Sequence, residues 1–319
     1  MTILNSLSIT DIQAAQSRIA NSVLRTPLIK LNVEEAPAEI YLKLENLQPI
    51  GSFKLRGAGN AIGLASKEQL ADGVYTASAG NMAQGVAWNA KRLGIPCTVI
   101  VPDHAPQTKL DAIARLGGEV IKVTFDEWWQ IIVNHHYPGQ KGLFIHPVSD
   151  PAVIAGNGTI GLEILEDLPD VDAVIMPYGG GGLSCGIAFA IKQLKKNTKL
   201  FAVEAETAAP LAASLKAGSP QVVEYTPTFI DGMGGKSILP EMWPLASKLI
   251  DDSLVMSVQE IADAVKLLLE RNRVLAEGAG AAPVAAAIAG KAGKGKVVCV
   301  ISGGNIDFSK VANILNGAI

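Results

Sequence analysis

The chain has 319 residues, of which 49% are hydrophobic and 18% are charged, and its formal net charge is −3. This balance is typical of a compact globular protein and excludes a disordered one. Charges of both signs are interspersed without a basic stripe, so nucleic acid is not an expected partner. The length exceeds the usual size of one hydrophobic core, and we therefore expect two domains.

Short apolar runs alternate along the chain with segments of helical periodicity. In chain order, the predicted strands are residues 40–44, 73–78, 97–101, 119–123, 173–176, 200–203 and 296–301. The predicted helices are residues 82–93, 107–116, 125–134, 154–165, 183–194 and 258–272, with Asn81 and Asp307 as helix caps. Such alternation predicts an α/β fold with parallel sheets and helices on both faces.

The cysteines and the termini indicate the compartment. Cys97, Cys185 and Cys299 are far apart and lie in apolar or glycine-rich runs, which is typical of buried free thiols in a reducing environment. The N-terminus lacks the basic region of a secretory signal. Residues 173–191 carry no charge, but they contain four consecutive glycines and Pro177, which favours strand, loop and helix over a membrane span. We expect a cytoplasmic protein with no membrane partner.

Three loops that follow predicted strands are rich in small and polar residues, and in open α/β sheets ligands bind at such loops. The sequence Ser78-Ala79-Gly80-Asn81 precedes a helix and would offer backbone N–H groups to a carboxylate, although plain helix capping is an alternative. A second loop supplies four glycines that favour a phosphate cradle over a tight connection: Gly179, Gly180, Gly181 and Gly182. The third loop, Ser302-Gly303-Gly304-Asn305, repeats this arrangement and offers a hydroxyl to a ring nitrogen.

Lys54 lies in the segment GSFKLRGAGN, residues 51–60, whose small residues let a flat ligand approach the backbone. The alternative is a surface lysine whose stem covers apolar surface. Glu277 is a lone carboxylate that enters an alanine-rich helix. The four histidines show no ligand spacing with cysteines or carboxylates, so we expect no metal site from them.

The motifs GSFKLRGA, SAGNMAQG, GGGGL and SGGN, in this order, resemble those of the fold-type II pyridoxal-phosphate (PLP) enzymes. Within that class the chain is similar to the threonine/serine dehydratase and serine racemase family, from about residue 27 to residue 305. The resemblance implies two three-layer α/β/α domains with mostly parallel sheets. Residues 1–70 and 148–319 would form a large cofactor-binding domain, and residues 71–147 a small mobile substrate-binding domain. It also implies a homodimer.

The resemblance implies roles for individual residues. Lys54 would hold PLP as a Schiff base and act as the base at the substrate Cα, with Phe53 packed on the ring. The remaining cofactor contacts would be Asn81 at the phenolic oxygen, Ser302 at the pyridine nitrogen, and, around the phosphate, Gly179, Gly180, Gly181, Gly182 and Leu183. The substrate carboxylate would meet Ser78, Ala79, Gly80, Asn81 and Met82, and Glu277 would make a further polar contact.

The implied reaction is β-elimination from a β-hydroxy amino acid such as L-threonine or L-serine, which yields a 2-oxo acid and ammonia. The neutral partner at the ring nitrogen weakens the electron sink and favours rapid elimination. Ala79 stands where racemases of the family have a serine that protonates Cα, so dehydration is favoured over racemisation.

Two further departures from the family pattern bear on the substrate and the metal. Met82 replaces a histidine, which leaves bulkier substrates such as phenylserine or 3-hydroxyaspartate open. Glu204 and the Ala208 carbonyl resemble a divalent-cation site, but the third ligand position is Pro210, so we expect no metal there. Serine racemase, a β-replacement synthase and a non-catalytic dinucleotide-like fold are the remaining alternatives.

Overall fold

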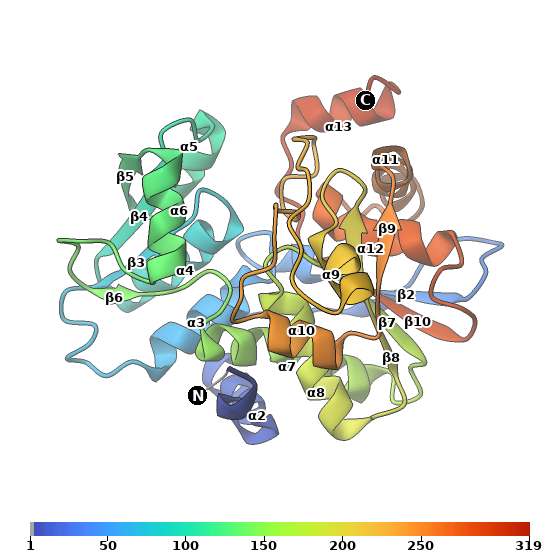
Figure 1. The fold of residues 1–319 in the computed structure, drawn as a ribbon, viewed down its shortest axis with the longest axis horizontal. Helices are drawn as coiled ribbons and strands as arrows, with labels where there is room; N and C mark the ends of the chain where they lie inside the picture. The colour runs from blue at the N-terminus through green and yellow to red at the C-terminus, as the bar shows by residue number, and fades with distance from the viewer. Residues whose placement is uncertain (1–2) are drawn as a thin grey trace.

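The computed structural model describes residues 3–319, in which the strands form two sheets (Figure 1). The six-stranded sheet has the order β1-β2-β10-β7-β8-β9, and the four-stranded sheet has the order β5-β4-β3-β6. All pairings are parallel except that of β1 with β2. The strands are β1 (Leu28–Lys30), β2 (Glu39–Lys43), β3 (Val74–Ala77), β4 (Cys97–Pro102), β5 (Glu119–Val123), β6 (Leu143–Phe144), β7 (Ala173–Pro177), β8 (Lys199–Ala205), β9 (Asp252–Met256) and β10 (Lys296–Val300).

Helices connect most of the strands. The α-helices are α1 (Ile3–Ser6), α2 (Ile9–Ile19), α3 (Lys54–Leu64), α4 (Asn81–Leu93), α5 (Gln107–Arg115), α6 (Phe125–Asn134), α7 (Pro151–Asp167), α8 (Gly182–Leu194), α9 (Pro210–Ala217), α10 (Trp243–Leu249), α11 (Val258–Leu267), α12 (Gly278–Ile288) and α13 (Phe308–Leu315). A 3-10 turn, η1 (Glu45–Leu47), follows β2, and a π-helical segment, η2 (Leu268–Asn272), continues α11. This arrangement confirms the predicted α/β class.

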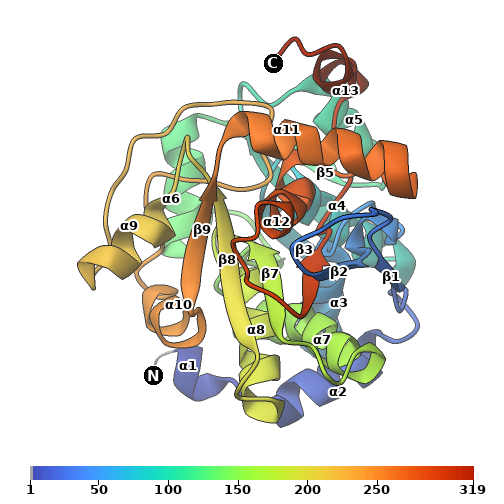
Figure 2. The ribbon, with the colours of Figure 1, turned by 90° about the vertical axis from the view of Figure 1, so that its right-hand side faces the viewer.

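The six-stranded sheet is buried on both faces, which explains its continuously apolar strands. In β10, Val297 and Cys299 face the core formed with α11 and α12, whereas Val298 and Val300 face the core formed with α7 and α8 (Figure 2). Successive side chains of a strand point to opposite faces, so two helical layers need apolar residues at every position. The six-stranded sheet and the helices on its two faces therefore form a three-layer α/β/α unit.

The four-stranded sheet has the same layered construction. Val99 packs with α4 and α5, and its neighbour Ile100 faces the core that includes residues of α6. In Figure 1 this sheet and its helices lie at the left, and α3 runs between them and the six-stranded sheet. Its strands span residues 74–144, inside the range predicted for the small domain. The domain boundaries themselves stay a prediction.

One of the sequence predictions about helix ends is wrong, and another is confirmed. Asn81 does not cap α4: it is the first helical residue, Gly80 occupies the cap position, and no side chain caps the helix there. The amide of Asn81 is instead bound to Glu277, far away in sequence. The helix predicted over residues 258–272 is confirmed over these residues, with π geometry from Leu268 to Asn272 and Arg273 after it at φ +57°.

The uncharged stretch from Ala173 to Ile191 forms β7, a glycine loop and most of α8, as predicted. None of the helices described for residues 3–319 combines the length and the apolar character that a membrane crossing requires. Cys97, Cys185 and Cys299 are buried and free, which confirms the expectation for the thiols.

Candidate functional site

One cavity of about 690 Å³ lies between the two sheet units and is lined by loops from both. The parallel strands end toward it, so their carboxyl-terminal loops meet there. The predicted site residues all line this cavity, namely Phe53, Lys54, Ser78, Ala79, Gly80, Asn81, Met82, Gly179, Gly180, Gly181, Gly182, Leu183, Glu277 and Ser302. The structure thus brings together predicted site residues that are up to 249 positions apart, as from Phe53 to Ser302.

Lys54 is the first residue of α3, and its side chain is half-buried in the cavity wall. Its Nζ donates to the carbonyl oxygen of Pro147 at 2.7 Å and lies 5.2 Å from the centre of the Phe53 ring. Among the described residues, no carboxylate forms an ion pair with this amine. Burial lowers the pKa of Lys54 to about 8, and the charge of Glu277 only partly opposes that shift. The amine is therefore poised to lose its proton near neutral pH.

The backbone around Lys54 is tied to the loop that carries Ser302. Phe53 N–H donates to the Ser302 carbonyl at 2.9 Å, and Ser52 and Gly303 form a β-bridge. Gly51 makes the required turn at φ +72°, where a Cβ would lie 2.6 Å from Oδ1 of Asn305. These contacts fix the relative position of the lysine and the serine.

The tetraglycine loop opens the helix α8 directly after β7. Gly181 has φ +95°, and a Cβ on Gly182 would lie 2.6 Å from the carbonyl oxygen of Val148. A Cβ on Gly180 would lie 2.5 Å from the side chain of Val148. The loop therefore requires glycine both for its conformation and for its close packing, and it presents the N-terminus of a 13-residue helix to the cavity.

The loop of residues 78–81 and the start of α12 meet across the cavity. Asn81 Nδ2 donates to Glu277 Oε1 at 2.9 Å, and Asn305 Nδ2 donates to Asn81 Oδ1 at 2.8 Å. Burial raises the pKa of Glu277 to about 8, and the negative charge of Asp231 adds to the shift. Ser302 is buried beside this group and lines the cavity.

Three residues that the sequence analysis connected with the substrate or a metal are buried in the structure. Met82 touches the cavity but is only 1% exposed, because it packs in the core of the four-stranded unit. The Glu204 carboxylate accepts bonds from Leu211 N–H, Ala212 N–H and Ser253 Oγ at 2.7–2.9 Å, so protein donors occupy it. Ala208, beside it, is buried.

The sequence spacing of the histidines gave no sign of a metal site, but the fold brings two of them close to a carboxylate. Ligand atoms of His135, His146 and Glu241 lie within 4.8 Å of one another. The His146 ring, however, already uses both nitrogens: Nε2 is 3.1 Å from the Ile132 carbonyl, and Nδ1 accepts the Ser149 N–H at 2.8 Å. This ring holds the turn that presents Pro147 to Lys54.

Sequence reasoning missed several charged and aromatic residues that line the cavity. Asp231 accepts bonds from Lys109 of α5 at 3.0 Å and from Lys310 of α13 at 3.1 Å, so these side chains bridge the two units. Phe125, Trp128 and Phe308 line the same cavity. No motif marks these residues, because they lie in separate loops and helix starts that only the fold brings together.

Known proteins resemble this chain over nearly its whole length. Residues 19–303 match the family model described as pyridoxal-phosphate dependent enzyme. An L-threonine ammonia-lyase of Thermotoga maritima is 45% identical, covering 97% of this chain and 78% of the relative. The catabolic L-threonine dehydratase TdcB of Escherichia coli is 40% identical, with 97% and 96% covered. The solved structure of maize serine racemase has a TM-score of 0.88 at 33% identity, with 98% and 97% covered.

The chain therefore belongs to the pyridoxal-phosphate dependent enzymes and has the fold-type II architecture. Its cavity fits that cofactor, because an amine without a counter-ion, a glycine cradle and a buried serine hydroxyl surround one space. The cofactor expected from the sequence is thus confirmed, together with the enzyme class.

Proposed function

We propose that the chain is a PLP-dependent dehydratase that converts L-threonine, and with it L-serine, to a 2-oxo acid and ammonia. The observation that carries this proposal is the Lys54 amine, which faces the cavity with a carbonyl oxygen as partner and a pKa near 8. Such an amine is neutral often enough at physiological pH to bind an aldehyde and to accept a proton. The threonine-degrading relatives support the choice of substrate.

The residues would hold the cofactor as follows. Lys54 would bind its aldehyde carbon, the loop from Gly179 to Gly182 with Leu183 would hold its phosphate, and Phe53 would pack on its ring. Ser302 would meet the ring nitrogen as a neutral partner. When bound, PLP supplies an electron sink for negative charge that develops at the substrate Cα.

The substrate would be positioned by the loop from Ser78 to Asn81. The N–H groups at the start of α4 favour a carboxylate, because the positive end of the helix dipole lies there. The amino group of the substrate would replace Lys54 at the aldehyde carbon, and the freed Lys54 amine would take the proton from Cα. The β-hydroxyl would leave with a proton as water. The released enamine then hydrolyses to the 2-oxo acid and ammonia, which restores the water that was lost.

Racemisation is the second candidate, favoured by the likeness to maize serine racemase. It requires a proton donor on the face of Cα opposite Lys54, and Ala79 at the cavity wall has no exchangeable proton. We therefore place dehydration ahead of racemisation. The bulkier substrates phenylserine and 3-hydroxyaspartate are less favoured than the sequence suggested, because Met82 is packed in the core.

One assay tests the proposal against its rivals. Purified protein loaded with PLP is incubated with L-threonine, L-serine, phenylserine and 3-hydroxyaspartate, and 2-oxo acid and ammonia are measured together with the chirality of the remaining serine. We expect equal amounts of 2-oxo acid and ammonia, with threonine as the best substrate. Faster formation of D-serine than of pyruvate would contradict the proposal.

Assembly and location are also proposals. We propose a homodimer in the cytoplasm, as the resemblance implies, and the buried free thiols suit a reducing compartment. Sedimentation equilibrium should give twice the chain mass of 33.3 kDa. A mass of one chain at micromolar concentration would contradict the dimer.

A further inference from the structure

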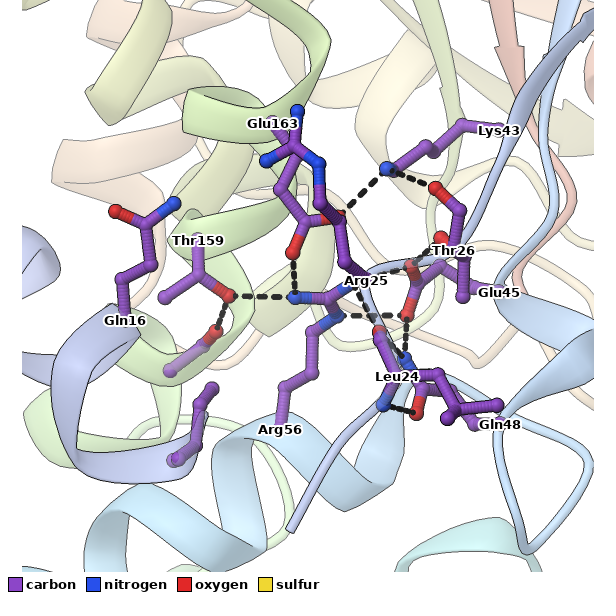
Figure 3. Close-up of polar contacts among 12 residues, drawn as sticks. Gln16, Leu24, Arg25, Thr26, Lys43, Glu45, Gln48, Arg56, Thr159 and Glu163 are labelled. Carbon is purple, nitrogen blue, oxygen red and sulfur yellow. Dashed lines mark hydrogen bonds and ion pairs between the residues drawn. The ribbon is translucent and has the colours of Figure 1, made fainter. Parts of the chain in front are cut away.

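The first turn of α3 carries two positively charged residues that point to opposite sides. Lys54 lines the cavity, whereas Arg56, two residues later, is 1% exposed and lies in the core (Figure 3). Two residues correspond to about 200° of rotation around a helix, so the directions of these side chains are coupled. Whatever holds Arg56 therefore sets the direction of Lys54.

Arg56 is held by two buried carboxylates from different elements. Its Nε and Nη2 donate to the two oxygens of Glu45 in η1, each at 2.8 Å. Its Nη1 donates to Glu163 of α7 at 2.6 Å and to Thr159 Oγ1 at 3.1 Å, and Nη2 also reaches Glu163 at 2.9 Å. The planar guanidinium thus meets two carboxylates in the bidentate geometry that lysine does not reproduce.

A second cation completes the cluster. Lys43, at the end of β2, donates from Nζ to Glu163 and to the Thr26 carbonyl, both at 2.6 Å. Thr26 Oγ1 in turn donates to Glu45 at 2.5 Å. Two positive and two negative side chains therefore balance in a site where each is at most 5% exposed. Figure 3 shows these contacts between β2, the turn after it, α3 and α7.

Such a cluster is a poor source of stability, because desolvation of the charges offsets most of their attraction. It does impose geometry, since only one orientation of α3 satisfies both carboxylates. The start of α3 lacks a side-chain cap that would do the same. Backbones also pack closely here: a Cβ on Gly156 of α7 would lie 2.5 Å from the carbonyl oxygen of Arg56.

We propose that Arg56, held by Glu45 and Glu163, is a positioning residue that fixes the first turn of α3 so that Nζ of Lys54 faces the cavity. The inference rests on the proposed role of Lys54. It is independent of which amino acid is the substrate, because it concerns the placement of the amine. Small displacements of a reacting group reduce rates strongly, so the effect on Lys54 should appear in kcat per folded molecule, beside the loss of stability that follows from leaving two buried carboxylates without Arg56.

The test compares Arg56→Lys and Arg56→Met with Asn60→Ala. Asn60 is a matched control, since it is a second buried anchor of α3, more than one turn away, with bonds to Arg18 at 2.5 Å and to the Ala152 carbonyl at 2.7 Å. For each variant, urea unfolding, kcat and KM for threonine, and the pH midpoint of PLP capture by the apoprotein are measured.

We expect both Arg56 variants to lose at least about tenfold in kcat per folded molecule, with KM changed by less than about threefold, and to shift the pH midpoint of PLP capture. The control should lose stability but keep kcat within about twofold. If Arg56→Met does not fold, Arg56→Lys alone decides, because it keeps the charge.

An unchanged kcat and midpoint in folded Arg56→Lys would overturn the inference and leave the cluster a purely structural feature. Failure of the proposed function is distinguishable from this outcome. In that case the wild-type protein would capture no PLP at Lys54, as mapped by peptide mass spectrometry after borohydride reduction, whatever happens at Arg56.

Discussion

Two lysines eleven residues apart differ in what surrounds them. Lys43 is fully buried and bound to the Glu163 carboxylate, so its charge is balanced. Lys54 lines the cavity, has a carbonyl oxygen as its partner, and has its pKa lowered to about 8 by burial. The comparison teaches that burial alone does not make a lysine reactive: burial must coincide with the absence of a paired carboxylate.

Replacing each lysine in turn gives the largest expected contrast. Lys54→Ala should reduce dehydratase activity by at least about 10³-fold with little change in stability, because a base and the cofactor link are lost together. Lys43→Met should cost about 3–5 kcal/mol of unfolding free energy, since a buried carboxylate loses a partner, while PLP still binds Lys54. Activity assays and urea unfolding measure the two effects. Full activity in Lys54→Ala would break the comparison.

Replacing single glycines of the tetraglycine loop is the second test. Gly182→Ala should weaken PLP binding at least about tenfold, because the new Cβ would lie 2.6 Å from a backbone oxygen of Val148. Gly179→Ala is the matched variant: its Cβ would lie 3.4 Å from Met233 Cα, and its effect should be much smaller. Fluorescence titration of the apoproteins with PLP gives both constants. Equal losses would argue against a phosphate site shaped by close packing.

The pH dependence of PLP capture tests the lowered pKa of Lys54. Capture uses the neutral amine, so its rate should rise with pH in proportion to the neutral fraction and level off above the pKa of Lys54, near 8. An ordinary lysine would level off near 10.5. Stopped-flow measurements between pH 6 and pH 10 locate the midpoint. A rate that still rises at pH 10 without levelling off, as an ordinary lysine would give, would show that burial does not control this amine.

A smaller shift is expected from Glu277→Gln. Glu277 has a pKa near 8 and is therefore partly negative at the capture midpoint, where its charge raises the pKa of Lys54; its removal should move the midpoint below 8, by a fraction of a pH unit. The amide keeps an oxygen for the bond from Asn81, so the cavity should retain its shape. The same stopped-flow series measures the shift. A midpoint that moves upward would reverse the assigned sign.

The smallest effect concerns the face of Cα opposite Lys54. Ala79→Ser introduces a hydroxyl at the cavity wall and should raise the yield of D-serine relative to pyruvate, while dehydration stays the main reaction. Ala79→Gly is the control, because it changes the volume without adding a proton donor. Chiral chromatography of the serine pool reports the ratio. Equal yields of D-serine from both variants would show that residue 79 does not supply the proton to Cα.

The sequence predicted many of the strands and helices that flank the cavity, because apolar periodicity and glycine-rich loops are local signals, but it did not predict α3, which carries Lys54. It also indicated Lys54, Ser302 and the tetraglycine loop, whose residue types carry the chemistry. It did not reveal Pro147 as the partner of Lys54 or Glu163 as a partner of Arg56, because these contacts join residues 93 and 107 positions apart. Asn81 was misassigned as a helix cap since its true partner, Glu277, is 196 residues away.

The location of the cofactor link tests the central claim most directly. Protein loaded with PLP is reduced with borohydride, digested, and the modified peptide is identified by mass spectrometry. The account predicts a single adduct on Lys54 and none on Lys43 or on exposed lysines such as Lys67. An adduct on another lysine, or none at all, would contradict the assignment of Lys54 as the reactive amine.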